Sequence, residues 1–186
     1  MSIAEPPAKV AVAELSKFRG ADLPDLCDAA EEAIRAGGGF GWIDPPDRQV
    51  MERYWNGVLA MPGRTLFVAR LDDIVVGSTQ LVRPPVNNEA QAKIASLTTA
   101  FVAPWARGHG LARQLVAHAE DRARREGFAA IQLDVRETQQ AAIELYRAMG
   151  YEHWGTNPVY AQIDGKHVAG LYFCKDLSSR SADETT

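Results

Sequence analysis

The stretch Arg107-Gly108-His109-Gly110-Leu111-Ala112 follows an apolar run and opens a long amphipathic segment. Its two glycines allow the backbone to turn tightly and to approach a ligand closely. The amides of a first helical turn have no carbonyl partner inside the helix, and they lie at the positive end of the helix dipole. A turn of this kind between a strand and a helix therefore predicts a site for a phosphate or pyrophosphate group. Alone it is a weak signal, because many α/β proteins have this order of elements and bind nothing there.

The periodicity of the chain on both sides of this stretch predicts alternating strands and helices. We expect strands at 10–15, 94–102, 131–135, 151–160 and 167–175, a hairpin of strands 65–71 and 74–82, and helices from a cap at Asp22 to the glycines at 37–39, at 47–59, at 109–126 and at 141–149. This order indicates an α/β (α+β) fold in which a central mixed β-sheet is flanked by about four helices.

The length and composition of the chain indicate one ordinary globular domain. Its 186 residues are enough for one full core, whereas two folding units would both be small. We expect a flexible N-terminus over residues 1–9, a single domain over 10–177 and a disordered tail over 178–186.

Charge and cysteine content exclude several classes of protein. The net charge is −4, and the basic residues are interleaved with acidic ones, so nucleic-acid binding is not expected. Two cysteines, Cys27 and Cys174, make neither a disulfide framework nor a metal site, which fits a reducing cytoplasm. The start of the chain has no long apolar segment, so we expect neither a signal peptide nor a membrane anchor.

A second block of sequence gives the opening stretch its context. Arg107-Gly108-His109-Gly110-Leu111-Ala112 resembles the Q/R-x-x-G-x-G/A acetyl-CoA loop of the GCN5-related N-acetyltransferases (the GNAT superfamily), and Leu133-Asp134-Val135-Arg136 with residues 142–151 resembles the next conserved block of that family. The resemblance covers nearly the whole chain. Within the superfamily, the chain most resembles the tabtoxin-resistance-like branch, because residues 77–81 and 155–161 are similar to segments of that branch. It implies a GNAT-like acyl-CoA N-acyltransferase fold and an enzyme that uses acetyl-CoA.

The resemblance also implies how acetyl-CoA is held. The amides of residues 109–112 would bind the pyrophosphate, and Arg107 and Arg113 would add positive charge. The main chain of Phe101 and Val102 would pair with the pantetheine arm, while their side chains are core by type. Gln139 stands where the family often has a cofactor-contacting asparagine, and a plain role at a helix start is the alternative.

For catalysis, the resemblance assigns Tyr146 as the general acid that protonates the departing sulfur; an ordinary buried helical tyrosine is the alternative. Ser96 stands where many relatives have a glutamate, and serine is no general base by itself. The base is then a bound water, Asp134 or Asp44, and Asp134 has a structural role as its alternative.

The acceptor is the least defined part of the prediction. Trp42, Asp44, Trp55 and Tyr160 would together form an aromatic wall with one carboxylate, suited to a cationic amine, and Ser96 is placed on the same substrate side. Each is also explained as a structural residue. We expect direct acetyl transfer to the primary amine of an amino-acid-like metabolite or toxin. A peptide N-terminal acetyltransferase and a catalytically quiet acyl-CoA sensor are the alternatives, and a homodimer is possible.

Overall fold

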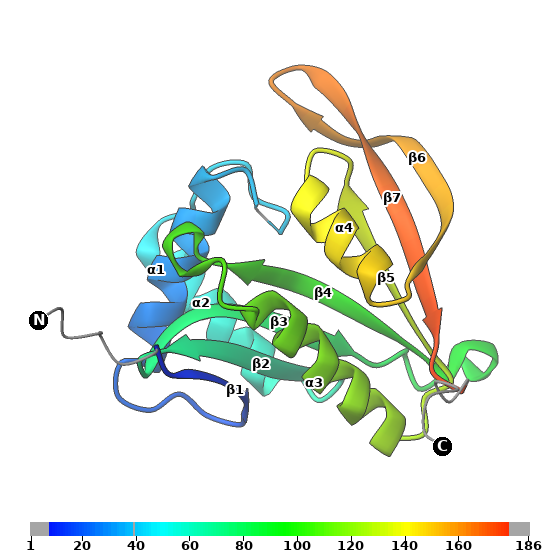
Figure 1. Ribbon diagram of the computed structural model, residues 1–186, viewed down its shortest axis with the longest axis horizontal. Helices are drawn as coiled ribbons and strands as arrows, with labels where there is room; N and C mark the ends of the chain where they lie inside the picture. The colour runs from blue at the N-terminus through cyan, green and yellow to red at the C-terminus, as the bar shows by residue number, and fades with distance from the viewer. Residues whose placement is uncertain (1–7, 39, 179–186) are drawn as a thin grey trace, which may run out of the picture.

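The computed structural model describes residues 8–38 and 40–178. One seven-stranded sheet has the order β1-β2-β3-β4-β5-β7-β6 (Figure 1). The strands are β1 (Val10–Leu15), β2 (Arg64–Leu71), β3 (Ile74–Val82), β4 (Ile94–Val102), β5 (Ala130–Arg136), β6 (Glu152–Ile163) and β7 (Lys166–Asp176), and the helices are α1 (Asp22–Arg35), α2 (Arg48–Ala60), α3 (Leu111–Arg125) and α4 (Gln140–Ala148), with short 3₁₀ turns η1 (Glu89–Gln91) and η2 (Pro104–Ala106).

The order and kind of these elements confirm the predicted mixed sheet with four helices. The predicted flexible N-terminus and disordered tail fall almost entirely on residues 1–7 and 179–186, which lie outside the described part of the chain.

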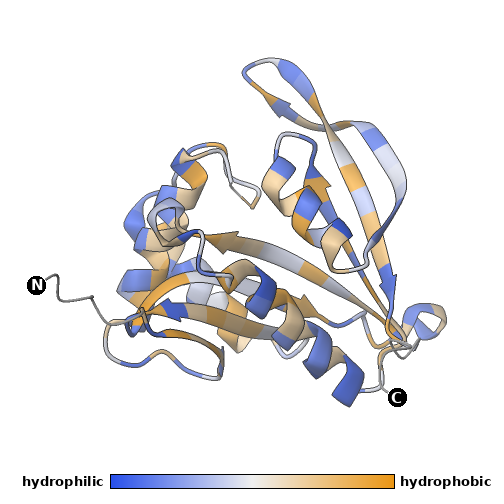
Figure 2. Cartoon of the chain, viewed as in Figure 1, coloured by the Kyte–Doolittle hydropathy of each residue, from blue (hydrophilic) through white to orange (hydrophobic). Residues whose placement is uncertain are grey.

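The helices cover the sheet on both faces. α3 packs on β1–β4, whereas α1 contacts β3 and β4 and α2 contacts β2 from the opposite side (Figure 1). The stripe on α3 predicted to face the sheet is buried: Leu111, Leu115, Val116, Ala119 and Ala123. Figure 2 shows the same division, with apolar residues along the central strands and a polar C-terminal end of α3.

The sheet opens between β4 and β5. These two strands are parallel, and residues 94–96 of β4 pair with residues 130–132 of β5. Beyond these three pairs the strands diverge (Figure 1). On the other side of β4, the register with β3 shifts between Ser78 and Gln80. Opposite this shift Thr99 has a φ of +56°, a left-handed conformation that is unusual for a β-branched residue. The ends of β4 and β5 thus separate and leave space inside the sheet.

Two predicted helix starts are wrong. The N-cap of α1 is Ala21 rather than Asp22, which is the first residue of the helix. The Asp22 carboxylate is buried; it accepts a hydrogen bond from the backbone N–H of Arg19 and forms an ion pair with Arg70 on β2. α3 begins at Leu111 and not at 109. Gly110 has a left-handed φ of +72°, so it cannot belong to the right-handed helix that follows it.

Candidate active site

Two adjoining cavities occupy the opening between β4 and β5. One has a volume of about 660 Å³ and the other of about 510 Å³. Both are lined by Gly38, Ala100, Gln139, Ala142 and Tyr146, so they meet at these residues. We call the first the loop cavity, since it is lined by residues of the 107–112 turn, and the second the hairpin cavity, since it is lined by residues of β6.

The turn before α3 forms one wall of the loop cavity. Gly108 and Gly110 have positive φ angles of 86° and 72°. The N–H of Gln114 donates to the carbonyl of Gly110, so the amides of residues 111–113 have no acceptor inside the helix. The residues of this turn that line the cavity are Arg107, Gly108, Gly110, Leu111, Ala112 and Arg113. The arrangement is that of an anion site at a helix N-terminus.

His109 lies away from the cavity although it stands in the middle of the turn. Its Nδ1 lies 3.2 Å from the carbonyl oxygens of Ala106 and Arg107. Arg107 lines the cavity, and its Nε also donates to the carbonyl of Val102 over 3.4 Å. The imidazole therefore contacts the turn itself.

The opposite wall of the loop cavity joins distant parts of the chain. Phe101 and Val102, at the end of β4, line the cavity and are nearly buried. Gln139 is the N-cap residue of α4, and its side chain makes no capping bond. Its Nε2 instead donates to the carbonyl of Gly37 over 3.1 Å, which links the start of α4 to the segment after α1.

Tyr146 lies where the two cavities meet. Its side chain is 6% exposed, and its ring packs against the rings of Tyr151 and Phe173 at centroid distances of 5.6 and 6.3 Å. Burial, with a smaller contribution from the negative charge of Asp134, raises the pKa of Tyr146 to about 12. The hydroxyl is therefore protonated at neutral pH and can donate a proton to a strong base formed beside it.

The hairpin cavity contains a carboxylate that is held by a tyrosine. Asp134 and Tyr160 both line this cavity, and the Tyr160 hydroxyl donates a hydrogen bond to Asp134 Oδ2. Burial, followed by that hydrogen bond, raises the pKa of Tyr160, so Tyr160 stays the donor. The Tyr160 ring lies against Gly170 on β7: a Cβ at position 170 would be 2.2 Å from Tyr160 Cγ.

Four of the residues predicted for the acceptor side line neither cavity. Trp42 packs on Phe40 and Tyr54, and Trp55 is completely buried in the core. Asp44 is exposed in the segment between α1 and α2. Ser96 lies where β4 and β5 still pair, and its hydroxyl accepts a hydrogen bond from Gln132 Nε2 over 3.3 Å. Of the predicted acceptor residues, Tyr160 alone lines a cavity in the described part of the chain.

A model of the acetyltransferase (GNAT) family matches residues 26–151, which is more than half of the chain. The chain belongs to this family. GNAT acetyltransferases use acetyl-CoA as the acetyl donor, and the chain is a GNAT-family N-acetyltransferase.

Individual relatives agree with the family. The chain is 60% identical over 131 residues to an uncharacterized N-acetyltransferase in the hisH-hisA intergenic region of Azospirillum brasilense, covering 70% of this chain and 78% of the relative. A GCN5-related N-acetyltransferase from Kribbella flavida matches with a TM-score of 0.72 and 28% identity, over 90% of this chain and 97% of that chain. The fold is also that of yncA from Salmonella typhimurium, solved with its cofactor acetyl-CoA, with a TM-score of 0.71 and 16% identity over 95% and 99% of the two chains.

Several residues that line the acetyltransferase's hairpin cavity were missed by sequence reasoning. They include Leu97, Thr98, Thr99 and Gln162. Tyr54 joins Thr99 to the interior: its hydroxyl lies 3.3 Å from Thr99 Oγ1 and accepts a hydrogen bond from Gln80, whose Oε1 is bonded by Arg64. A glutamine in an apolar strand was the available signal, because such a side chain needs a partner when it is buried.

Two further properties of the described residues bear on the site. No group of three or more histidine, cysteine, aspartate or glutamate side chains among them is arranged to hold a metal ion. Within the same residues, every helix is too short or too polar to span a membrane.

Proposed function

We propose that this acetyltransferase moves the acetyl group of acetyl-CoA directly to the primary amine of a small amino-acid-like molecule, with Tyr146 as the general acid. The observation that carries the proposal is the position of Tyr146. It lines both the loop cavity and the hairpin cavity, and its hydroxyl is protonated at neutral pH. Such a group serves a reaction in which a thiolate leaves on one side while an amine arrives on the other.

Each part of the loop cavity fits one part of acetyl-CoA. The amides of residues 111–113 and the charges of Arg107 and Arg113 suit the pyrophosphate. The main chain at Phe101 and Val102 suits the pantetheine arm, since β4 has no strand partner beyond Ser96 on the β5 side. Gln139 lines both cavities, so its side-chain amide is placed to contact the arm where it enters the hairpin cavity.

The chemistry then proceeds by direct transfer. The amine nitrogen attacks the thioester carbon, and the C–S bond of the resulting tetrahedral intermediate breaks. The Tyr146 hydroxyl gives its proton to the departing thiolate, which yields the free thiol of CoA. The new amide nitrogen loses a proton to a base, and the tyrosinate is reprotonated from solvent. Asp134 is the carboxylate that lines the hairpin cavity, and we assign it, acting directly or through a water, as that base.

The size of the hairpin cavity favours a small acceptor. A volume of about 510 Å³ lies in the range of small-molecule sites. An extended peptide would need an open groove, and a sensor domain would not need a protonated tyrosine beside the thioester. The segments 77–81 and 155–161 support a place in the tabtoxin-resistance-like branch, which is part of the proposal.

The experiment is thiol release from acetyl-CoA across a panel of amines, amino acids and N-terminal peptides. Small amino-acid-like amines should release CoA thiol in proportion to product amide, measured by mass. Release with peptides alone would replace the proposal by a peptide acetyltransferase. Binding of acetyl-CoA without thiol release from any acceptor would replace it by an acyl-CoA sensor.

A further inference from the structure

The hairpin cavity contains one negative and one positive side chain. Among the described residues that line it, Asp134 and Arg136 are the charged ones. We propose that the acceptor is an α-amino acid with an uncharged side chain, whose carboxylate is bound by Arg136 and whose amine lies between Asp134 and Tyr146. This inference rests on the proposed function, because it names the substrate class of the same site.

The placement of the two charges follows from the geometry of β5. Side chains two residues apart in a strand lie on the same face, about 6.6 Å apart along the chain. Asp134 and Arg136 alternate with the buried Leu133 and Val135, and both line the hairpin cavity. They carry opposite charges in one cavity lining, so a ligand with both charges can lie across the two side chains.

The amine belongs at Asp134 because that residue lies toward the reaction centre. Asp134 lines the hairpin cavity together with Tyr146, which also lines the loop cavity, and the negative charge of Asp134 acts on the Tyr146 hydroxyl. Tyr160 occupies Asp134 Oδ2 and fixes the carboxylate in the cavity. An ammonium bound there becomes the reactive amine once it gives one proton to solvent, and the second proton leaves to the base after the attack.

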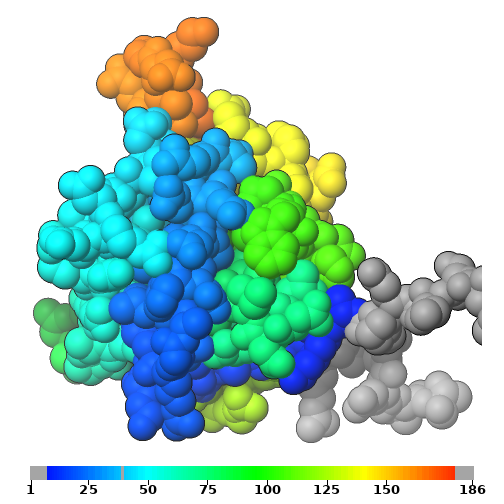
Figure 3. Space-filling view, turned by 90° about the vertical axis from the view of Figure 1, so that its left-hand side faces the viewer, coloured from blue at the N-terminus to red at the C-terminus, as the bar shows by residue number. Residues whose placement is uncertain are grey.

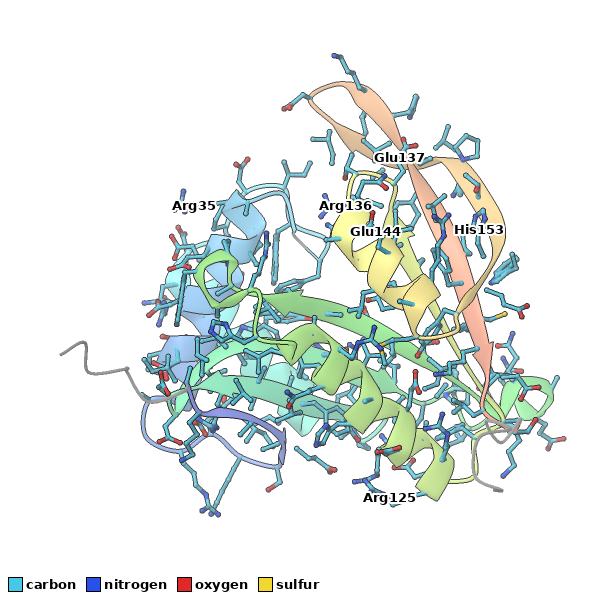
Figure 4. The ribbon with its side chains drawn as sticks, viewed as in Figure 1. Arg35, Arg125, Arg136, Glu137, Glu144 and His153 are labelled. Carbon is cyan, nitrogen blue, oxygen red and sulfur yellow. The ribbon has the colours of Figure 1, made fainter. Side chains whose placement is uncertain are left out.

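The carboxylate belongs at Arg136, at the end of β5. Figure 4 shows Arg136 beside the start of α4, and the residue lines the cavity that contains Asp134. Arg136 also has a partner within the chain. A guanidinium has five N–H donors in a planar fork, so it can serve that partner and still bind a carboxylate. Glu137, the next residue, uses its carboxylate to accept the N–H of Ala169.

The remaining lining explains why the side chain of the acceptor should be uncharged. Phe40, Ile43, Ala161 and Ile163 give apolar surface, and Thr98 and Gln162 give neutral polar groups. With Asp134 and Arg136 engaged by the amine and the carboxylate, no further charged side chain of the described lining is left for a charged substituent. A buried charge without a partner is strongly disfavoured.

The test compares each amino acid with its primary amide, which keeps the amine and removes the negative charge. L-alanine, L-leucine and L-glutamine are assayed against their amides by thiol release. The wild type should prefer the amino acid by roughly ten- to a hundredfold in kcat/KM, the range for a hydrogen bond to a charged group. The amine of an amino-acid amide has a lower pKa than the amine of the amino acid, so more of the amide is in the reactive, uncharged form. This difference favours the amide, and a preference for the amino acid must therefore come from recognition of its carboxylate.

Two variants separate recognition from folding. Arg136→Met should raise KM for the amino acids by a similar factor and remove the preference for the amino acid over its amide. Arg125→Gln, at the exposed far end of α3 (Figure 4), is the matched control and should leave both unchanged. Equal use of acids and amides by the wild type, or an equal loss of both in Arg136→Met, would overturn the proposal.

A binding measurement keeps this inference distinct from the proposed function. The melting temperature of the protein with CoA is measured with each amino acid and with its amide. A rise in melting temperature that the amino acid gives, that its amide does not give and that Arg136→Met loses supports the site. If such a rise is seen and no thiol is released, the proposed reaction fails and the proposed ligand class stands. A shift that is absent, or the same for acid and amide, overturns the inference.

Discussion

Tyr146 is held by the rings of Tyr151, which follows α4, and Phe173 on β7, and it lines both cavities. Tyr146→Phe keeps the ring and removes the proton donor. We expect kcat to fall about a hundredfold, at the lower end of what general acid catalysis contributes, because a thiolate is already a good leaving group. Affinity for acetyl-CoA, measured by calorimetry, should change little. An unchanged kcat in this variant would remove Tyr146 from the mechanism.

Gly170 controls the position of Tyr160. A methyl group at residue 170 would lie 2.2–2.8 Å from three atoms of Tyr160, so the ring must move and the hydrogen bond to Asp134 must break. We expect Gly170→Ala to lower kcat/KM at least as much as Tyr160→Phe, which loses the hydroxyl and keeps the ring.

Gly155→Ala is the control for that comparison, because a Cβ at residue 155, in the same hairpin, meets nothing within 4 Å. Full activity in Gly170→Ala would show that the packing of the Tyr160 ring against Gly170 on β7 is not needed for the reaction. Melting temperatures of all three variants separate a local effect from loss of the fold.

At the scale of elements, the start of α3 depends on a backbone conformation that glycine adopts easily. Gly110 has a φ of +72°, and a Cβ there would meet no atom within 4 Å. Gly110→Val is therefore strained by its backbone alone, at a cost of about 1–3 kcal/mol. The turn should relax and its amides should leave the anion site, so that acetyl-CoA binding is lost from a folded protein.

The matched control for that variant is Gly20→Val. Gly20 also has a positive φ, of 52°, with nothing within 4 Å, and it lines neither cavity. Both variants should lose a similar amount of thermal stability, and Gly110→Val alone should lose acetyl-CoA affinity by calorimetry. Unaltered affinity in Gly110→Val would mean that the turn does not hold the cofactor.

The far end of α3 is tied to the sheet by charge. Glu126 accepts hydrogen bonds from Arg83, which follows β3, and from Arg122. The hydrogen bond from Arg83 is the largest cause that lowers the pKa of Glu126 below its ordinary value of 4.5. A carboxyl whose pKa is lowered on folding stabilises the protein above its unfolded pKa and loses that contribution as pH falls through the folded value.

Glu126→Gln should therefore destabilise the protein at neutral pH and flatten the fall of its melting temperature below about pH 4.5. Glu144→Gln removes an exposed carboxylate on α4 (Figure 4) without removing these ion pairs, and its pH profile should follow the wild type. Parallel profiles for Glu126→Gln and the wild type would contradict the assignment.

Residues that favour turns made the hairpin turn and two helix ends predictable. Asp72 and Asp73 both take positive φ, as a tight hairpin turn requires, and Gly127 and Gly150 take it where α3 and α4 were expected to end. The bulge at Thr99 was not predictable, because it results from the register that β4 adopts against β3. For the same reason, counting along the sequence pointed to Ser96, which lies in the paired part of β4.

Residues that line the cavities could be named from the sequence where a motif fixes the backbone, and they were missed where tertiary packing decides. Every residue of the 107–112 turn except His109, together with Tyr146, lines the loop cavity, and their roles stay predictions. Trp55 was assigned to the acceptor wall from its aromatic type, yet its helical spacing with Met51 and Val58 places it in the core. Arg136 was quoted as part of a motif, and its place in the same cavity as Asp134 became visible from the lining of the hairpin cavity.

Over the whole molecule, the sheet divides at the opening into two parts. β1–β4 and β5–β7 are joined by three paired residues at the start of β4, by the bond from Gln139 to Gly37 and, through α3, by the ion pair of Glu120 with Lys175 on β7. Figure 3 shows the face where α1, η2 and α4 meet, with the β6–β7 hairpin standing out beyond them. A cofactor in the loop cavity would contact both parts, since α3 and β4 line one side and α4 the other.

Acetyl-CoA should therefore stabilise the molecule as a whole. A ligand that binds only the folded state at a concentration of 100 times its Kd contributes about 2.7 kcal/mol. For a chain of this length that corresponds to a rise of roughly 5–10 °C in melting temperature. The expected result, by scanning calorimetry, is a single transition that moves upward with the logarithm of acetyl-CoA concentration, and no such movement in Gly110→Val. Two transitions, of which acetyl-CoA moves one, would show that the cofactor binds one part alone, because a ligand that contacts both parts must raise the temperature at which both unfold.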